Sequence, residues 1–113
     1  MRPVIKVFLY DEDGNRFFGE GPCRLLHGIE ETGSLRASAQ QMDMAYTKAL
    51  SILKRAEKAL SFPLTEKSIG GKGGGGSRLT PKAKEFLKQY EEYRDACCQA
   101  GSRIYLDIFS EQQ

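Results

Sequence analysis

Residues 33–60 constrain the fold more than any other stretch, because they carry the start signal, the turn and the apolar spacing of two consecutive helices. Ser34 is a favourable N-cap for a short first helix. Asp43 stands where the chain must turn, and Asp is one of the few residues that tolerate a left-handed conformation. A second helix is predicted over residues 45–60. Two helices joined by so short a turn predict a helix-turn-helix at residues 34–60.

The second of these helices has one apolar and one polar face. Its apolar positions follow the 3.6-residue period of an amphipathic helix at Ala49, Ile52, Leu53, Ala56 and Leu60. The opposite face carries Thr47, Lys48, Ser51, Lys54, Arg55 and Lys58. Side chains of these types donate to phosphates and base edges, although an ordinary solvated helix face has the same composition.

Charge is distributed unevenly along the 113 residues, although the net charge is only +2. Residues 45–84 carry nine basic and two acidic side chains, whereas residues 1–44 and 85–113 are each net acidic. A basic centre between acidic flanks is expected of a nucleic-acid-binding surface on an ordinary globular body. The length fits a single domain over residues 1–113.

The N-terminal part predicts a small hairpin followed by helices. Residues 1–19 form the predicted β-hairpin, with strands over Val4 to Tyr10 and Asn15 to Phe18 on either side of an Asp-Gly turn. Pro22 is suited to the first position of a helix. The helical region is therefore expected to span residues 21–61.

A second hairpin is predicted over residues 64–80, directly after the helix-turn-helix, which is the position of a wing. Its tip, residues 70–76, reads GGKGGGG, so the backbone is free of side-chain bulk and can approach a phosphate or a groove floor. Lys72 supplies charge at the tip, and Arg78 lies near the base. A nucleotide-binding loop is disfavoured, because no βαβ unit surrounds the glycines and Gly73 stands where a Walker-type loop has Ser or Thr.

A long C-terminal helix with a possible kink or end at Gly101-Ser102 is predicted over residues 81–109. Its apolar stripe is longer than a small domain can cover, so it is expected to meet the same helix of a second chain. The expected interface residues of this homodimer are Leu87, Tyr90, Tyr93, Cys97 and Ile104. The alternative is that the apolar tail from Ile104 to Phe109 folds back onto the N-terminal ribbon.

The remaining side chains predict no metal site, no cofactor and no enzyme. Cys23, Cys97 and Cys98 lack the spacing of zinc ligands, and the single His27 is expected to be structural. The sequence offers no paired carboxylates or activated nucleophile for catalysis. It also has no apolar run of the roughly 20 residues that span a membrane and no signal-peptide core, so a cytoplasmic location is expected.

From about residue 20 to residue 95 the sequence resembles the N-terminal DNA-binding domain of the ModE family of molybdate-responsive regulators, which are related to LysR-type winged helix proteins. The resemblance rests on the Gly33-Ser34-Leu35 start, the Met42 to Tyr46 turn, Leu53, the Phe62-Pro63-Leu64 exit, and the GGKGGGG string followed by Leu79-Thr80. It implies a mainly α, partly β (α+β) winged helix-turn-helix that binds an operator as a dimer and regulates transcription.

Several positions depart from the family pattern. Asp43 stands in place of Gly, Ala45 in place of Ser, and Leu50 in place of a common aromatic residue. Ala45 cannot cap the second helix, which costs about 1 kcal/mol, and it lacks a hydroxyl that could touch DNA, so the preferred operator is expected to differ. Molybdate-sensing members carry a C-terminal oxyanion-binding module that this sequence does not contain. Molybdate binding is therefore not expected, and any effector would act through a partner protein or the dimer interface.

Together these features predict a sequence-specific transcriptional regulator that binds double-stranded DNA through the helix at 45–60 and the wing at 70–76. The residues expected to contact DNA are Ser34, Arg36, Tyr46, Thr47, Lys48, Ser51, Lys54, Arg55, Lys72 and Arg78. Thr47, Lys48 and Ser51 would face base edges, and Ser34 and Arg36 would contact backbone phosphates. Tyr46 would reach either the core or a phosphate, and Lys54 and Arg55 would contact phosphate or stay solvated. Lys72 would reach the minor groove or flanking phosphates from the wing, with Arg78 near the base of the wing. The competing hypothesis, motivated by the departures above, is a winged helix adaptor that binds proteins and has lost specific DNA binding.

Overall fold

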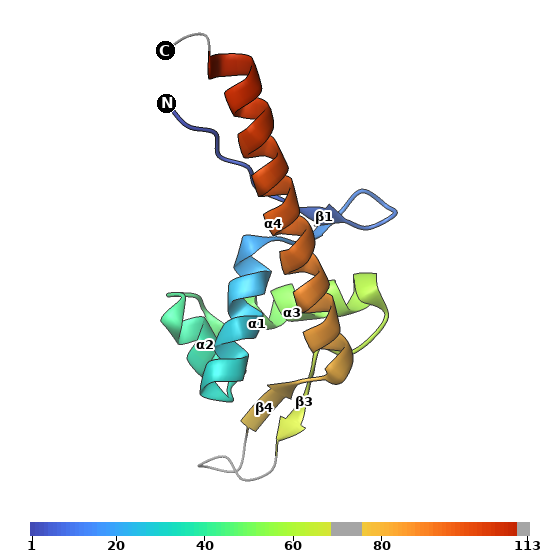
Figure 1. Ribbon diagram of the computed structural model, residues 1–113. Helices are drawn as coiled ribbons and strands as arrows, with labels where there is room; N and C mark the ends of the chain where they lie inside the picture. Colours follow the sequence, from blue (N-terminus) through green and yellow to red (C-terminus); the bar gives the residue numbers. More distant parts are fainter. Residues whose placement is uncertain (69–75, 111–113) are drawn as a thin grey trace.

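The computed structural model describes residues 1–68 and 76–110, which form four helices and two separate two-stranded antiparallel sheets (Figure 1). In chain order the elements are β1 (Leu9–Tyr10), β2 (Arg16–Phe18), α1 (Glu20–Thr32), α2 (Leu35–Gln41), α3 (Tyr46–Leu60), β3 (Thr65–Ser68), β4 (Gly76–Leu79) and α4 (Pro81–Phe109). This order confirms the predicted α+β winged helix architecture.

The helix-turn-helix forms with the predicted local signals. The Ser34 hydroxyl accepts a hydrogen bond from the Ala37 N–H at 3.1 Å and so caps α2. Asp43 has a φ of 51°, which places it in the left-handed region expected of the turn. Ala45 is the N-cap of α3 and makes no side-chain capping bond, as its methyl group requires.

The helices α1 and α2 pack closely because small residues meet at their crossing. Ser38 is fully buried, and its hydroxyl donates to the carbonyl oxygen of Leu25 at 2.8 Å. A Cβ built on Gly28 would clash with the Ser38 hydroxyl oxygen, so only glycine allows this approach. The contact fixes α2, and through the turn α3, on the surface of α1.

The N-terminal hairpin is shorter than predicted. Its loop is as expected, since the Asp11 carboxylate accepts from the backbone N–H groups of Asp13 and Asn15. However, only Leu9–Tyr10 pairs as a strand, and residues 1–8 run along α4 instead (Figure 1). A side chain of α4 binds a backbone carbonyl of this segment: the hydroxyl of Tyr105 donates to the Met1 oxygen at 3.0 Å.

Two predicted boundaries need correction, the start of α1 and the end or kink inside α4. The helix α1 begins at Glu20, two residues before Pro22. A helix tolerates proline in its first turn, because the N–H that proline lacks would have no hydrogen-bond partner there. The helix α4 continues through Gly101-Ser102 to Phe109, so the predicted kink or end is wrong. A Cβ on Gly101 would clash with the Ile5 side chain, and the glycine therefore makes room for the N-terminal segment.

Two of the predicted dimer residues belong to the core of this chain. Leu87 and Tyr90 are each 3% exposed, so assigning them to a contact with a second chain was wrong. The ring of Phe18 packs edge-on against the rings of Phe86 and Tyr90, with both centroid distances 4.8 Å. The period-3.6 stripe on the first half of α4 therefore serves the domain itself.

The second half of α4 projects away from the core (Figure 1). Tyr93 and Ile104 remain exposed there, and Cys97 is half-buried. The tail does not fold back as in the alternative, because α4 continues to Phe109; the N-terminal segment extends along it instead, and Tyr105 contacts Met1. Although α4 has 29 residues, neither it nor any other helix in the described parts of the chain is apolar enough over a sufficient length to cross a bilayer.

The wing follows α3 as predicted, in the register Thr65 with Leu79 through Ser68 with Gly76. It is attached to the helices through β4, since the Ser77 N–H donates to the Gly33 carbonyl oxygen at 2.7 Å. This bond places β4 beside the turn between α1 and α2. Residues 70–75 of the predicted tip, including Lys72, lie outside the described residues, whereas Gly76 belongs to β4.

Candidate nucleic-acid interface

The helix α3 exposes the polar face that the sequence assigned to it. Ala49, Leu53 and Ala56 are buried in the core. The exposed side chains are those of Tyr46, Thr47, Lys48, Ser51, Lys54, Arg55 and Lys58. A helix that buries one face in the domain and presents hydroxyl, ammonium and guanidinium groups on the other can contact base edges and phosphates in a groove.

The start of α3 is held by a contact with α2. The guanidinium carbon of Arg36 lies 4.3 Å from the centroid of the Tyr46 ring, a cation–π contact between two exposed side chains. This contact brings together two of the predicted DNA-binding residues, one from the first turn of α2 and one from the first turn of α3. Ser34 is half-buried, and its oxygen already accepts the capping bond from Ala37. Only its hydroxyl proton therefore remains for an external acceptor.

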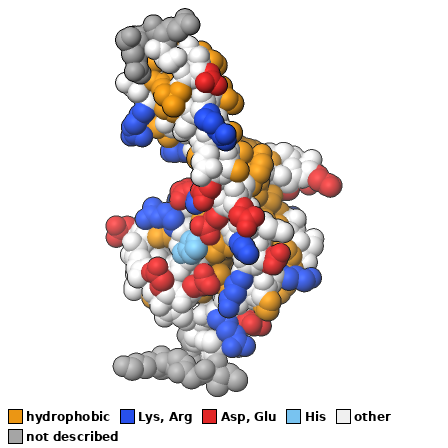
Figure 2. All heavy atoms as spheres, in the orientation of Figure 1, with side chains coloured by type: hydrophobic (Ala, Val, Ile, Leu, Met, Phe, Trp, Pro, Cys, Tyr) orange, Lys and Arg blue, Asp and Glu red, His pale blue; other side chains and the backbone are white. Residues whose placement is uncertain are grey.

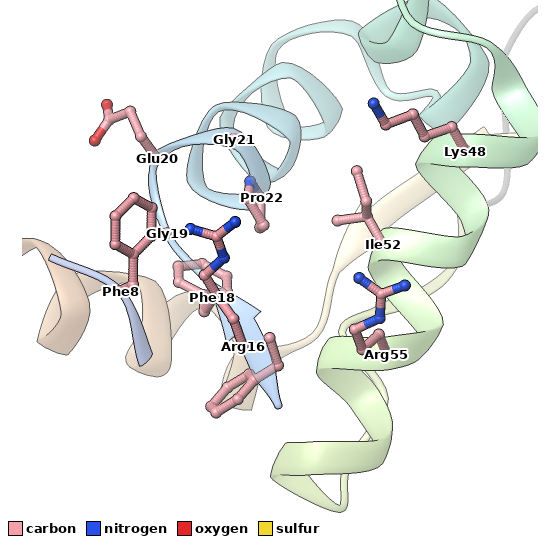
Figure 3. A pocket seen from close by; sticks show the side chains of 11 residues that line it. Phe8, Arg16, Phe18, Gly19, Glu20, Gly21, Pro22, Lys48, Ile52 and Arg55 are labelled. Atoms are coloured by element: carbon pink, nitrogen blue, oxygen red, sulfur yellow. The ribbon is translucent and has the colours of Figure 1, made fainter. Parts of the chain in front are cut away.

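One edge of α3 faces the N-terminal hairpin across an open cavity of about 440 Å³ (Figure 3). Lys48, Ile52 and Arg55 line it from α3, and Arg16 lines it from β2. The Arg16 guanidinium also lies over the Phe8 ring, 4.5 Å from its centroid. Three cations from two distant segments thus border one cavity.

Arg16 is a candidate that sequence reasoning missed. It is exposed and lies in the strand nearest the polar face of α3. Nothing local in the sequence marks it, because its relation to Lys48 and Arg55 arises only when the hairpin packs beside α3. It extends the basic surface of α3 toward the hairpin.

The tip of the same hairpin brings negative charge to the other end of α3. Asp11 and Asp13 line an open depression of about 750 Å³ together with Lys54 and Lys58. The Asp11 carboxylate is used in the hairpin loop, whereas Asp13 is exposed. In the sequence these carboxylates belong to the acidic N-terminal flank, and only the packing of the hairpin brings them beside α3. They reduce the positive potential at the C-terminal half of this helix.

At the wing, Arg78 pairs with a carboxylate across the two strands. Its Nε lies 3.1 Å from the Glu66 Oε1 in an exposed ion pair. Such a pair costs little to break, since exposed salt bridges contribute roughly 0–1 kcal/mol. Arg78 is therefore able to exchange Glu66 for a phosphate.

No protein-family model matches the chain. It is similar to the molybdenum transport protein ModE of Herbaspirillum seropedicae, with 40% identity over 77 residues, or 68% of this chain and 27% of the relative. The transcriptional regulator ModE of Haemophilus influenzae is 37% identical over 68 residues, 60% of this chain and 27% of the relative. The chain thus matches only about a quarter of the length of these relatives.

Among solved structures, the CbnR DNA-binding domain in a complex with DNA superposes with a TM-score of 0.60. The match covers 78% of this chain and 95% of that domain at 18% sequence identity, so it bears on the fold. The sequence matches cover 68% and 60% of this chain, and the structural match covers 78% of it. The chain has a winged helix-turn-helix fold and is similar in sequence to part of ModE proteins.

Proposed function

We propose that this chain is the DNA-binding part of a transcriptional regulator, acting in the cytoplasm without catalytic activity, and that α3 enters the major groove of double-stranded DNA. The observation that carries the proposal is the exposed polar face of α3, opposite the buried Ala49, Leu53 and Ala56. The width of the major groove admits an α-helix. A ModE relative is named a transcriptional regulator, and the similar CbnR domain was solved with DNA.

The contacts divide by position on the surface. Thr47, Lys48 and Ser51 lie in the first two turns of α3 and would reach base edges. The residues assigned to phosphates are Ser34, Arg36, Tyr46, Lys54, Arg55, Lys72 and Arg78, to which the structure adds Arg16. Phosphate contacts set affinity and register, whereas the few groove-facing side chains set sequence preference.

A homodimer is the proposed form that binds DNA. The projecting half of α4 exposes Ile104 and Ile108, which lie one turn apart on the same face of the helix, and Leu106 on another face, each more than half accessible. Val4 of the N-terminal segment is exposed as well. Apolar side chains clustered on one projecting helix are typical of an association surface. A two-fold pair would present two α3 helices to half-sites about one DNA turn, ~34 Å, apart or a multiple of it.

Selection of bound fragments from a random duplex pool, followed by fluorescence anisotropy on the enriched and a scrambled duplex, tests DNA recognition. Specific binding predicts an enriched near-palindrome and an affinity that falls steeply with salt concentration, because phosphate contacts release counterions. A chain that enriches no sequence and binds both duplexes equally weakly at low salt would instead fit the protein-binding adaptor.

Sedimentation equilibrium tests the dimer separately. Ile104→Glu places a charge on the exposed apolar face and is expected to shift the chain toward monomer. Gln99→Glu adds the same charge at another exposed position of α4 and serves as the matched control. A wild-type chain that stays monomeric at all concentrations, without and with DNA, contradicts the homodimer.

A further inference from the structure

A cysteine, a histidine and a glutamate meet where α1 packs on α4. Cys23 and His27 are four residues apart on α1 and therefore lie on one face of that helix. Glu91 faces them from α4, with its Oε1 3.1 Å from the His27 Nε2. One potential ligand atom from each of the three residues lies within 4.8 Å of the other two.

We propose that Cys23, His27 and Glu91 form a binding site for a zinc-class divalent transition-metal ion. Thiolate sulfur, imidazole nitrogen and carboxylate oxygen are the three ligand types that Zn²⁺ takes in proteins, and three protein ligands leave a fourth position for water. Bonds of about 2.0–2.3 Å in a tetrahedron hold ligand atoms roughly 3.3–3.8 Å apart. The observed separations, all within 4.8 Å, exceed the upper end of that range by about 1 Å at most.

The imidazole has a partner for its second nitrogen. Glu30 lies one helical turn along α1 from His27, and its Oε1 is 3.7 Å from the His27 Nδ1. A small rotation of the Glu30 side chain would bring this carboxylate within hydrogen-bond distance of Nδ1, where it would fix the tautomer that presents Nε2 as a ligand, an arrangement common among metal-bound histidines. The Glu91 carboxylate is oriented as well, because its second oxygen lies 3.6 Å from the Arg94 guanidinium.

The site is accessible from solvent. His27 and Glu91 line an open cleft of about 450 Å³ between α1 and α4, whereas Cys23 is buried behind them. Figure 2 shows the histidine side chain at this surface with acidic side chains around it. An ion can therefore enter past the imidazole, and the cleft has room for a water ligand.

Among the described residues, Arg94 is the cation close to the sulfur, and its guanidinium lies 4.0 Å from the Cys23 Sγ. Its charge is already matched, since it also pairs with Glu20 at 3.4 Å and with Asp95 at 3.0 Å. Lys84 and Lys88 also line the cleft, but the carboxylates there outnumber them: Glu30, Glu91, Glu92 and Asp95. The surroundings thus favour a divalent cation.

This inference revises the sequence-based expectation of no metal site. The Cys-x-x-x-His spacing on the predicted first helix was visible, but two residues do not hold an ion. The third ligand is 64 positions away from His27 in the chain. Only the packing of α4 on α1 supplies it.

Cobalt titration of the full chain, reduced and stripped with EDTA, provides the test. Tetrahedral Co²⁺ bound through a thiolate gives visible ligand-field bands and a near-ultraviolet sulfur-to-cobalt charge-transfer band. We expect one Co²⁺ per chain with both features, displaced by Zn²⁺. Cys23→Ser should abolish the charge-transfer band, and His27→Gln and Glu91→Gln should each weaken binding by about tenfold or more.

The controls use the other cysteines and a neighbouring carboxylate. A Cys97→Ser/Cys98→Ser double variant and Glu92→Gln should bind Co²⁺ like the parent. Absence of stoichiometric binding in the parent, a charge-transfer band that survives Cys23→Ser, or its loss in the double variant would overturn the site. Should Cys23→Ser fail to fold by circular dichroism, the two solvent-accessible ligand variants decide, and unchanged affinity in both rejects the proposal.

Discussion

The hydroxyl of Tyr90 donates a hydrogen bond to the carbonyl oxygen of Val7 at 2.9 Å, which joins α4 to the N-terminal segment across 83 positions of sequence. The same ring packs against Phe18 in the core. Burial is the main cause that raises the pKa of Tyr90, so the phenol stays neutral and remains a donor. Residues 1–8 are therefore an integral part of the fold.

Removing this hydroxyl should lower stability measurably. Tyr90→Phe leaves the partly buried Val7 carbonyl without its donor while keeping the ring, so the expected loss is about 1 kcal/mol of unfolding free energy. Tyr93→Phe, at an exposed position three residues on, is the control and should change stability little. Urea unfolding of both variants measures the difference, and equal midpoints would contradict a structural role for the bond.

Two glycines of α1 should respond oppositely to alanine. A methyl group at Gly28 meets the buried Ser38 side chain, so Gly28→Ala should force α1 and α2 apart and cost about 1–3 kcal/mol. Gly21 has no atom within 4 Å of an added Cβ, and Gly21→Ala should be neutral or slightly stabilising. Thermal unfolding of the pair checks the claim, which fails if Gly28→Ala is tolerated as well as Gly21→Ala.

Local chemistry made the helix-turn-helix predictable. Three features depend only on a few neighbouring residues: the cap at Ser34, the left-handed turn at Asp43 and the two faces of α3. The structure has all three. The wing was predictable for the same reason, because its two arms are close in sequence. These features carry most of the proposed DNA interface.

Long-range packing was not predictable in the same way. The periodic pattern of α4 shows that Leu87 and Tyr90 need covering but does not say which residues cover them, and the covering elements are this chain's own. Residues 1–8 alternate like a strand, yet their carbonyls bind side chains of α4. Arg16 next to α3 depends on tertiary contacts of the same kind.

The three thiols should differ in reactivity. Burial is the first cause that raises the pKa of Cys23, to about 11, so at pH 8 it stays protonated as well as inaccessible. Cys97 and Cys98 are half-buried and within reach of reagent. In chelator-treated protein, peptide-resolved mass spectrometry after brief iodoacetamide treatment should find Cys23 labelled last. Labelling of Cys23 at the rate of Cys98 would contradict its burial.

Arg16 should contribute to DNA affinity without setting sequence preference. Arg16→Ala removes one phosphate contact beside Lys48 and Arg55, so binding should weaken on every duplex alike, and the slope of log affinity against log salt should fall by about 1. Lys88→Ala removes an exposed cation from α4 and is the control for net charge. Anisotropy titrations at several salt concentrations measure both, and identical slopes for the two variants would exclude Arg16 from the interface.

The acidic hairpin tip should oppose DNA binding. Asp13 lies beside Lys54 and Lys58 on the rim of one depression, so a phosphate approaching this end of α3 is repelled by its carboxylate. Asp13→Asn should therefore tighten binding a few-fold, and the gain should shrink at high salt because exposed charges are screened. Asp107→Asn removes an identical charge near the far end of α4, where no gain is expected. Equal tightening by both variants would show that net charge alone matters and that the hairpin tip does not border the bound DNA.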